Sequence, residues 1–571
     1  MNQLTVIDLF CGAGGFSEGF RQQGFKIKLG IDKWESAIRT FNHNFNLNCT
    51  VKNILDFQFS VAEIEALPDS DIIIGSPPCV TFSSSNISGK ADKSSGITLT
   101  QLFLKVVAVK KWKQNSTLKA WFMENVPSSI KHLGNEYTFE ELGLGDWATM
   151  NKIGRSKVAI KLQGNQQVIN SADYGSAQCR ERVIAGEIIS RKRLIIPKPT
   201  HANLEKKESV LKPWRALKDI KKGLPSPFSS SGFKKITDPN YPEIQLLQTN
   251  LSDHFYDTGL FECEWKQSMF LKVNHPYMGK MSFPENEEKP SRTITATKIG
   301  TSREAIIYKS ENDRKRNGEF RTPTVREAAC IMGFPITYQF LGGETTKWRL
   351  VGNAVCPSVA SAFAKQVRIE LGLGAIQKPA LQLVPCLENI NNLNSYSTKV
   401  FQTPPKRNKG SRFRRHAFKD GNITVTLSNY DIDKNGKDTS KWRTSIQYGN
   451  GEGFPTFNLG DGHYRKIESI IKEVKQGPRF LDIINNGFSE KIAKGDLLQE
   501  MYEVQKSTKP YLEPTMLVEK VAEIINSFNI EDENFNQNQR SIFKNKEVVP
   551  LKQLFALYAI NKIATIANDK Q

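Results

Sequence analysis

The chain is poor in histidine, and its cysteines stand far apart. Only seven of the 571 residues are histidines, which leaves little room for chemistry centred on imidazole. The eight cysteines form no CxxC pair. This scatter argues against a zinc site and against a disulfide framework, and it is typical of a protein from a reducing compartment.

Long apolar runs are also missing. No uninterrupted apolar stretch is long enough to cross a bilayer, and the N-terminus begins directly with a predicted strand rather than with a basic and then apolar signal segment. We therefore expect a cytoplasmic protein that does not enter a membrane.

Positive charge, in contrast, is abundant. Lysine and arginine number 79 against 59 acidic residues, a net charge of +20, and the pI is about 9.4. This excess favours a polyanionic partner, first of all nucleic acid, although a solvated basic surface has the same composition. The length predicts two or three domains, and an apolar content of 39% is sufficient for their cores.

The first 45 residues predict the start of a Rossmann-like unit. Residues 4–10 form an apolar strand, a glycine-rich loop follows at 12–15, and a helix begins near Phe16. A second strand at 26–31 ends on Asp32, and a helix at 35–45 comes next. The loop fits a dinucleotide, a phosphate, an adenosyl group or a simple tight turn. Asp32 fits either a ligand for ribose hydroxyls or an ordinary helix start.

Three further strands are predicted before residue 125. They end at residues 53–54, 74 and 123, and a helix with an apolar face lies at 99–112. The fourth strand leads into GSPPC at 75–79, where glycine and two prolines present Cys79 on a stiff loop. Cys79 is either a nucleophile or a buried structural residue. The fifth strand delivers Glu124 to the same rim of the sheet, which favours the catalytic interpretation.

Two arginines follow in the segment 168–188. Alternation along a strand would place Arg180 and Arg182 on one side, where they suit an anion, a base edge or a carboxylate; a solvated edge strand is the alternative. The composition of about 197–290 then predicts an inserted, loop-rich domain. Regular structure resumes at 291–296, in a capped helix at 324–335, and after a glycine turn at 352–355 that opens a helix running to 367.

Together, these motifs resemble those of the DNA (cytosine-5) methyltransferases over about the first 370 residues. They occur in the family's order: DLFCGAGGF at 8–16, PC at 78–79 with FS at 82–83, ENV at 124–126, QCRER at 178–182, REAA at 326–329, GFP at 333–335 and GNAV at 352–355. The resemblance is to the bacterial enzymes of restriction-modification or phage-defence systems.

The resemblance implies an α/β fold with a Rossmann-like, S-adenosylmethionine-dependent methyltransferase domain made of residues 1–195 and 291–372. Residues 196–290 would form an inserted, loop-rich target recognition domain that reads bases in the major groove. A linker at 373–405 would lead to a C-terminal α+β accessory domain at 406–571.

The resemblance also implies a covalent mechanism. Cys79 would add to C6 of a cytosine flipped out of the duplex, so that C5 can attack the methyl group of S-adenosylmethionine. Glu124 would bind N3 and the exocyclic amine. Arg182, together with Arg180, would hold the O2 edge and position Cys79. A loop at about 83–95 would close over the site.

The same resemblance assigns a cofactor site without a metal. S-adenosylmethionine, which leaves as S-adenosylhomocysteine, would lie on the rim of the sheet. Its contacts would be Phe10 at the adenine, Gly12 and Gly14 at the methionine part, Asp32 at the ribose, and Asn53, Pro78, Asn353 and Val355 around them. Two residues depart from the family pattern: Asn53 replaces an acidic residue that reads the adenine amine, and Val80 replaces a glutamine.

The expected function is sequence-specific methylation of cytosine C5 in double-stranded DNA, in a bacterial cytoplasm at the nucleoid, with other subunits of a defence system as further partners. A tRNA cytosine methyltransferase is the alternative enzyme, because one eukaryotic branch of this fold acts on tRNA. A catalytically inactive DNA-binding scaffold is the non-enzymatic alternative, and the presence of Cys79, Glu124 and Arg182 argues against it.

The last 200 residues lie outside the resemblance. Residues 379–405 have the composition of a linker, and 406–416 carry six basic residues and no acidic one. Strands are predicted at 423–427 and 444–448, and amphipathic helices at 517–528 and 554–566. The basic run suits phosphate contacts, although a basic linker face has the same composition. We expect an accessory domain that binds DNA or else docks on a partner protein.

Overall fold

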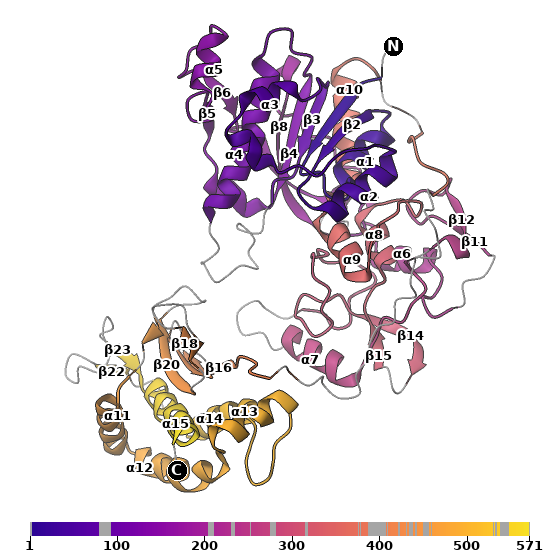
Figure 1. The fold of residues 1–571 in the computed structure, drawn as a ribbon. Coiled ribbons are helices and arrows are strands. Elements are labelled where there is room, and N and C mark those ends of the chain that lie inside the picture. The colour runs from indigo at the N-terminus through magenta and orange to yellow at the C-terminus, as the bar shows by residue number, and fades with distance from the viewer. Residues whose placement is uncertain are drawn as a thin grey trace. The chain divides into compact units, whose positions relative to one another are not determined.

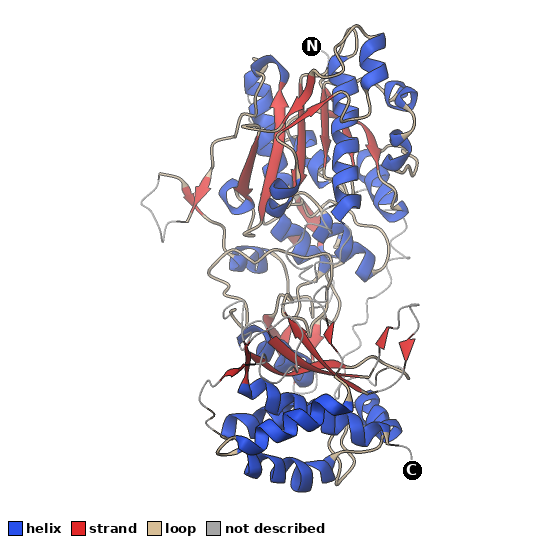
Figure 2. Ribbon diagram, turned by 90° about the vertical axis from the view of Figure 1, so that its left-hand side faces the viewer, coloured by secondary structure: helices blue, strands red, loops and turns tan. Residues whose placement is uncertain are grey.

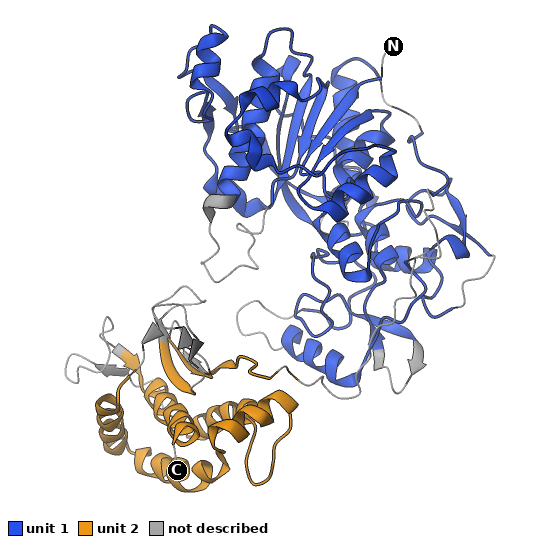
Figure 3. Cartoon of the chain, viewed as in Figure 1, with its two compact units in different colours: residues 1–86, 92–403 blue, residues 87–91, 404–571 orange. Residues whose placement is uncertain are grey.

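The fold is that of a computed structural model. It describes residues 3–78, 93–203, 210–229, 234–251, 253–273, 281–314, 318–374, 376, 378–385, 407, 409–420, 423–429, 431–432, 438–439, 442–448, 456–457, 459–528, 530, 534–536 and 548–569. The contacts divide it into two compact units, one within residues 1–403 and one within 404–571 (Figure 3).

A six-stranded sheet forms the centre of the first unit, in the order β2-β1-β3-β4-β8-β7 (Figure 1). Strands β2, β1, β3 and β4 run parallel to one another. β8 pairs antiparallel with β4, and β7 pairs antiparallel with β8. The strands are β1 Thr5–Leu9, β2 Lys26–Ile31, β3 Ile72–Gly75, β4 Ala120–Asn125, β7 Gln166–Asn170 and β8 Glu181–Ile188. Because the parallel strands end at one edge, that edge collects the loops that follow them.

Helices cover both faces of this sheet (Figure 2). Successive strand residues point to opposite faces, so Ile72 and Ile74 belong to one core and Ile73 to the other. The first core includes α1 Gly15–Gln22, α2 Glu35–Phe45 and α10 Pro357–Glu370; the second includes α3 Val61–Ala66 and α4 Lys93–Trp112. Smaller elements at the edges are η2 Pro127–His132, β5 Glu136–Thr138, α5 Gly145–Met150, β6 Val158–Lys161, η3 Ser171–Tyr174 and η4 Ile189–Arg191.

Most predicted elements of this unit are confirmed, and one strand is not. The second strand and the helix after it have the predicted bounds, as β2 and α2. No strand closes at residues 53–54. Instead, the Asn53 side chain accepts a hydrogen bond from the N–H of Leu55 and caps the 3-10 helix η1, Ile54–Gln58. The Asn53 side chain binds a nearby backbone N–H in place of a backbone carbonyl, so this residue starts a helix rather than ending a strand.

Residues between the sheet and α8 form many short elements. These are β9 His201–Ala202, β10 Lys212–Pro213, α6 Leu217–Gly223, β11 Lys235–Thr237, β12 Gln245–Leu247, η5 Gln248–Asn250, β13 Gly259–Leu260, α7 Glu262–Val273, β14 Tyr308–Arg314 and β15 Gly318–Arg321. β13 pairs with β15, so a sheet joins residues on both sides of position 290. The segment 291–296 contributes one bridge, from Ser291 to Gln178, rather than the predicted regular structure.

The predicted capped helix is α8, Val325–Met332. Thr324 and Glu327 form a capping box, and Gly333 ends the helix with a φ of 92°. The glycine turn predicted at 352–355 is not a turn at Gly352, which is buried inside helix α9, Glu344–Asn353. The following helix, α10, is present and ends at Glu370, three residues beyond the predicted end at 367.

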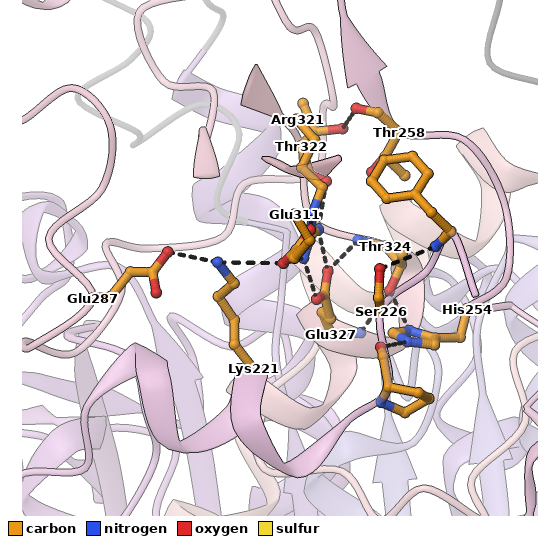
Figure 4. Close-up of polar contacts among 12 residues, drawn as sticks. Lys221, Ser226, His254, Thr258, Glu287, Glu311, Arg321, Thr322, Thr324 and Glu327 are labelled. Carbon is orange, nitrogen blue, oxygen red and sulfur yellow. Dashed lines mark hydrogen bonds and ion pairs between the residues drawn. The ribbon is translucent and has the colours of Figure 1, made fainter. Parts of the chain in front are cut away.

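A buried ionic network holds α8 against the segments before it (Figure 4). The Arg321 guanidinium bonds to both carboxylate oxygens of Glu327 at 2.8 Å, and also to Glu311. Lys221 of α6 pairs with Glu311 and Glu287. Burial alone would raise the pKa of Glu327, but Arg321 lowers it to about 2. The carboxylate therefore stays charged, and the network joins α6, β14, β15 and α8.

A second buried pair joins Asp253 to Arg326 of α8. The Arg326 Nε and Nη2 atoms donate to the two carboxylate oxygens at 2.8 and 3.0 Å, and both side chains are fully buried. Arg326 also donates to the carbonyl of Tyr338 at 2.7 Å. Burial tends to raise the pKa of Asp253, but Arg326 and Lys347 hold it below its usual value. The pair therefore fixes the segment around residue 253 to the helix.

Replacing Asp253 with asparagine is expected to destabilise the first unit by about 3–5 kcal/mol, because Arg326 would stay buried without a charged partner. Urea unfolding followed by tryptophan fluorescence measures this. The matched control is Glu140→Gln, which breaks an exposed pair with Arg155 and should leave the midpoint unchanged. Equal midpoints for the two variants would contradict a structural role of the Asp253–Arg326 pair.

The second unit has its own core between an antiparallel sheet and a set of helices. The sheet has the order β16-β17-β20-β21, with β16 Arg414–Asp420, β17 Ile423–Ser428, β20 Arg443–Tyr448 and β21 Thr456–Phe457. The helices are α11 Asp461–Glu473, α12 Gly477–Asp482, η7 Ile483–Phe488, η8 Ser489–Lys491, α13 Gly495–Val504, α14 Pro514–Ser527 and α15 Leu551–Asn568. Two small ladders are β18 Asp431–Ile432 with β19 Asp438–Thr439, and β22 Asn534–Asn536 with β23 Val548–Pro550.

The two strands and two helices predicted for this region are therefore present. Most of the predicted linker, residues 386–406, lies outside the described residues. Across the described ranges, no helix is both long and apolar enough to cross a membrane.

Candidate active site

A cavity of about 1570 Å³ opens at the carboxyl edge of the parallel strands. Ten of the predicted site residues line it: Phe10, Gly12, Asp32, Asn53, Pro78, Glu124, Arg180, Arg182, Asn353 and Val355. They come from the ends of β1, β2, β3 and β4, from the start of η1, from β8 and the residue before it, and from the end of α9 and the residues that follow. Cys79, Val80 and most of the loop predicted at 83–95 lie outside the described residues, directly after Pro78.

The end of β1 places Phe10 and Gly12 at the cavity wall. Phe10 has a positive φ of 58°, which is uncommon for a residue with a side chain and is concentrated at functional sites. Gly12 has a φ of 53°, and an added Cβ would meet nothing within 4 Å. The backbone at Gly12 is therefore open to a ligand in the cavity.

Asp32 fixes this loop from the end of β2. Its Oδ2 accepts the Gly12 N–H at 3.0 Å, and its Oδ1 accepts the Trp34 N–H at 2.8 Å. Burial raises the pKa of Asp32, and these two N–H groups oppose the rise. Each carboxylate oxygen keeps a lone pair for a further donor such as a hydroxyl group.

Gly14, in contrast, does not line the cavity. An added Cβ would lie 2.5 Å from the Phe45 ring and 2.7 Å from the Tyr338 hydroxyl oxygen. Its φ of 88° is also a glycine conformation. The close approach that requires glycine here is to these two aromatic side chains, and the predicted contact of Gly14 with the cofactor stays a prediction.

Glu124 and Arg182 form an ion pair in the cavity wall. The Arg182 Nε lies 2.9 Å from Glu124 Oε1, and both side chains are largely buried. Glu124 is near the end of β4, and Arg182 is near the start of the antiparallel neighbour β8. The pair leaves a carboxylate and a guanidinium side by side, one able to accept and the other to donate hydrogen bonds.

Arg180 has a different environment from Arg182, which corrects the predicted alternation. It precedes β8 and is buried. Its guanidinium donates to the carbonyl oxygens of Ile294, Gly352 and Ala354 at 3.0, 3.2 and 3.3 Å. Arg180 thus ties the bridge segment after residue 291 to the end of α9, next to Asn353 and Val355.

A comparison with known families decides which class of protein this is. The sequence model of the C-5 cytosine-specific DNA methylases matches residues 4–368. The chain belongs to this family. The predicted enzyme class, DNA (cytosine-5-)-methyltransferase, and the predicted α/β fold with additional segments are thereby confirmed.

Two named type II methyltransferases agree with this assignment. The type II methyltransferase M.AplI of Arthrospira platensis is 25% identical over 374 residues, which are 65% of this chain and 87% of the relative. The type II methyltransferase M.DdeI of Desulfomicrobium norvegicum is 26% identical over 395 residues, 64% of this chain and 88% of the relative. Among solved structures, the methyltransferase EhMeth of Entamoeba histolytica has 17% identity and a TM-score of 0.37, covering 65% of this chain and 99% of that one.

The methyltransferase cavity also contains residues that no motif pointed to. Trp34 and Arg349 both line it, and the Arg349 guanidinium lies 4.8 Å from the centroid of the Trp34 ring. The sequence indicates Trp34 only weakly, as an aromatic residue two positions after Asp32. Arg349 had none, because its contact joins two distant parts of the sequence.

Asp8 is a further residue whose position only the structure reveals. It is buried at the end of β1, and the Ser17 hydroxyl of α1 donates to its Oδ2 at 2.7 Å. Burial raises the pKa of Asp8 to about 8, so the carboxyl is largely uncharged at neutral pH. Asp8 thus joins β1 to α1 through this hydrogen bond and does not line the cavity.

Proposed function

We propose that this methyltransferase transfers a methyl group from S-adenosylmethionine to C5 of a cytosine in double-stranded DNA. The observation that carries the proposal is that one cavity contains both the Glu124–Arg182 pair and the open backbone at Gly12 beside Asp32. A polar pair suited to a base edge and a loop suited to a nucleoside thus share one space.

The residues of the loop end fit S-adenosylmethionine. Gly12 has room for a ligand, and Asp32 has free lone pairs for ribose hydroxyls. Phe10 offers a ring to the adenine. Asn53 would contact the adenine amine through the second lone pair of Oδ1, since the first accepts the Leu55 N–H. When bound, this cofactor would supply an electrophilic methyl group.

The remaining predicted cofactor contacts come from two other parts of the cavity wall. Pro78 lies directly before Cys79 and would border the cofactor on the side of the nucleophile. Asn353 and Val355 would close the site from the end of α9, held in place by the bonds of Arg180 to the neighbouring carbonyls.

The other end of the proposal is the chemistry of the base. Cys79 would add as a thiolate to C6 of a flipped-out cytosine, which makes C5 nucleophilic. The Glu124 carboxyl group would share a proton with N3 and accept a hydrogen bond from the exocyclic amine, so that this proton neutralises the negative charge that moves onto the ring. Arg182 would hold both Glu124 and the O2 edge. Arg180 is then a positioning residue, because its nitrogens bond to backbone carbonyls.

The segment 196–290 would act as the target recognition domain, and residues 308–321 would share in it through the β13–β15 pairing. The type II names of M.AplI and M.DdeI support a role of this chain in restriction-modification or phage defence. Further subunits of such a system would be its partners, and it would act at the bacterial nucleoid.

Label transfer from methyl-tritiated S-adenosylmethionine tests the proposal. Unmethylated duplex DNA should become labelled, and nuclease digestion should recover the label in 5-methylcytosine; bisulfite sequencing of the product would give the recognition site. A tRNA transcript serves as the competing substrate and should remain unlabelled. Label in tRNA with none in DNA would overturn the proposal in favour of RNA methylation, and label in neither would favour an inactive scaffold.

A further inference from the structure

The sheet of the second unit has two chemically different faces. Val425 and Leu427 of β17 are buried in the core with α14 and α15. Arg415 lies opposite Leu427 in the ladder and pairs with Glu519 of α14 at 2.8 Å, so it belongs to the same face. This face is the one that packs on the helices, and it accounts for the folding of the unit.

The opposite face carries only polar side chains in its two described rows. Residues directly opposite one another in an antiparallel sheet point to the same side. One row consists of Arg414, Ser428 and Arg443, and the next consists of His416, Thr426 and Ser445. His416 Nδ1 lies 2.7 Å from the Thr426 hydroxyl oxygen. Neither row contains an apolar side chain or a carboxylate.

Exposure within these rows follows the charge. Arg414 and Arg443 are partly exposed and His416 is exposed, whereas Thr426 and Ser445 are buried between them. Arg412, two residues before Arg414, is exposed as well. We call Arg412, Arg414, His416 and Arg443, with the two serines and the threonine of these rows, the basic sheet face.

The charge of the second unit is concentrated on this strand and the residues before it. Residues 406–419 contain seven lysines and arginines and no acidic residue, whereas residues 420–571 contain 20 basic and 21 acidic residues. Arg407 is held in place by stacking 4.0 Å from the Tyr502 ring centroid and by donating to the Tyr502 carbonyl at 2.6 Å. The basic segment is therefore built into the fold of the unit at its start.

We propose that the basic sheet face binds the phosphate backbone of duplex DNA without regard to sequence. The inference rests on DNA being the substrate of the methyltransferase unit. Guanidinium groups are the usual donors to phosphate oxygens, and exposed or partly exposed positions of this face carry them. Protein interfaces, in contrast, have an apolar centre, and the described rows of this face have none. The second unit thus gives the enzyme a hold on DNA that is separate from target recognition.

The salt dependence of DNA binding tests this with the full chain. Arg412→Gln combined with Arg414→Gln removes two charges from the basic sheet face. The slope of log K against log salt should become shallower by about 2, because each lost phosphate contact contributes about 0.9. The loss of affinity should be equal for duplexes with and without the recognition site. With saturating DNA, kcat should stay within about two-fold of the wild type, since the reacting groups are untouched.

The matched control removes the same charge elsewhere in the unit. Arg465 and Lys466 are exposed on α11, and Arg465→Gln with Lys466→Gln should leave the slope unchanged. Equal slopes for the two double variants would overturn the proposal. So would a variant that binds DNA like the wild type but changes its sedimentation coefficient, which would indicate a protein contact.

Failure of this proposal can be distinguished from failure of the proposed function. If the wild type labels tRNA instead of DNA, the proposed function fails; a shallower slope of the variant on duplex DNA would still support the basic sheet face. Thermal unfolding of the variants confirms that they fold. Arg412→Gln alone, at an exposed position ahead of β16, serves where the double variant does not fold, with an expected slope change of about 1.

Discussion

Replacing Glu124 with glutamine is expected to lower kcat by about 10²- to 10³-fold, because the amide retains the size of the carboxyl but not its charge or its proton. The Glu124 carboxyl group lies 2.9 Å from Arg182 in the cavity wall, where a proton shared with N3 would neutralise the charge that the addition of a thiolate places on the cytosine ring. The binding constant for S-adenosylmethionine should not change, since the proposed cofactor contacts are with the glycine loop and Asp32. Single-turnover label transfer and equilibrium binding of the cofactor measure the two quantities.

A carboxylate at the other end of the same strand pair gives the matched control. Glu187 of β8 accepts from Lys111 at 2.6 Å and lies opposite Trp121, at the amino end of β4. Glu187→Gln therefore breaks a similar ion pair in the same sheet, away from the cavity. It should retain kcat even if it unfolds at a lower temperature. If both variants lose activity alike, the effect of Glu124 is structural rather than chemical.

The strands that carry the site could be predicted because each has buried apolar residues and ends in a glycine or a polar residue. Residues 120–123 are apolar throughout, residues 26–31 alternate two lysines with apolar residues, and the ends of these two strands place Asp32 and Glu124 at one edge of the sheet. The predicted strand at residues 53–54 is wrong because Asn53 caps the next helix. The cap depends on a hydrogen bond between its Oδ1 and the Leu55 N–H, which the sequence alone does not reveal. Single residues of this kind start a helix or end a strand according to context.

Arg180 shows a second limit of prediction from sequence. Its position two residues before Arg182 suggested one shared role, but its bonds are to carbonyl oxygens at residues 294, 352 and 354. Those partners lie more than a hundred residues away, and no local pattern reveals them. Asp253 and Arg326 are 73 residues apart, and no local pattern reveals their pairing either, although it decides how the middle segment is held. Local periodicity predicts elements, whereas buried polar partners depend on the tertiary fold.

Replacing Cys79 with serine is expected to lower methyl transfer by at least about 10⁴-fold, because the variant lacks the thiolate that adds to C6. A duplex with 5-fluorocytosine at the methylated position tests this step directly. In the proposed mechanism the sulfur would bond to C6 and the methyl group to C5, but the final elimination would require loss of a proton from C5. Fluorine cannot leave as a cation, so the C6–sulfur bond remains. The wild type should therefore form a covalent enzyme–DNA adduct that survives denaturing electrophoresis.

Cys79→Ser should form no such adduct, and a second cysteine variant controls for the loss of a thiol in general. Cys263 is a partly exposed cysteine on α7, and Cys263→Ser should trap DNA like the wild type. An adduct of normal yield with Cys79→Ser would contradict the covalent role of Cys79, whereas loss of the adduct with Cys263→Ser would move the nucleophile to another segment. Because Cys79 directly follows Pro78 in the cavity wall, the trapped base would lie within reach of Glu124 and Arg182. Glu124→Gln should then slow the formation of the adduct, whereas Cys79→Ser should prevent it.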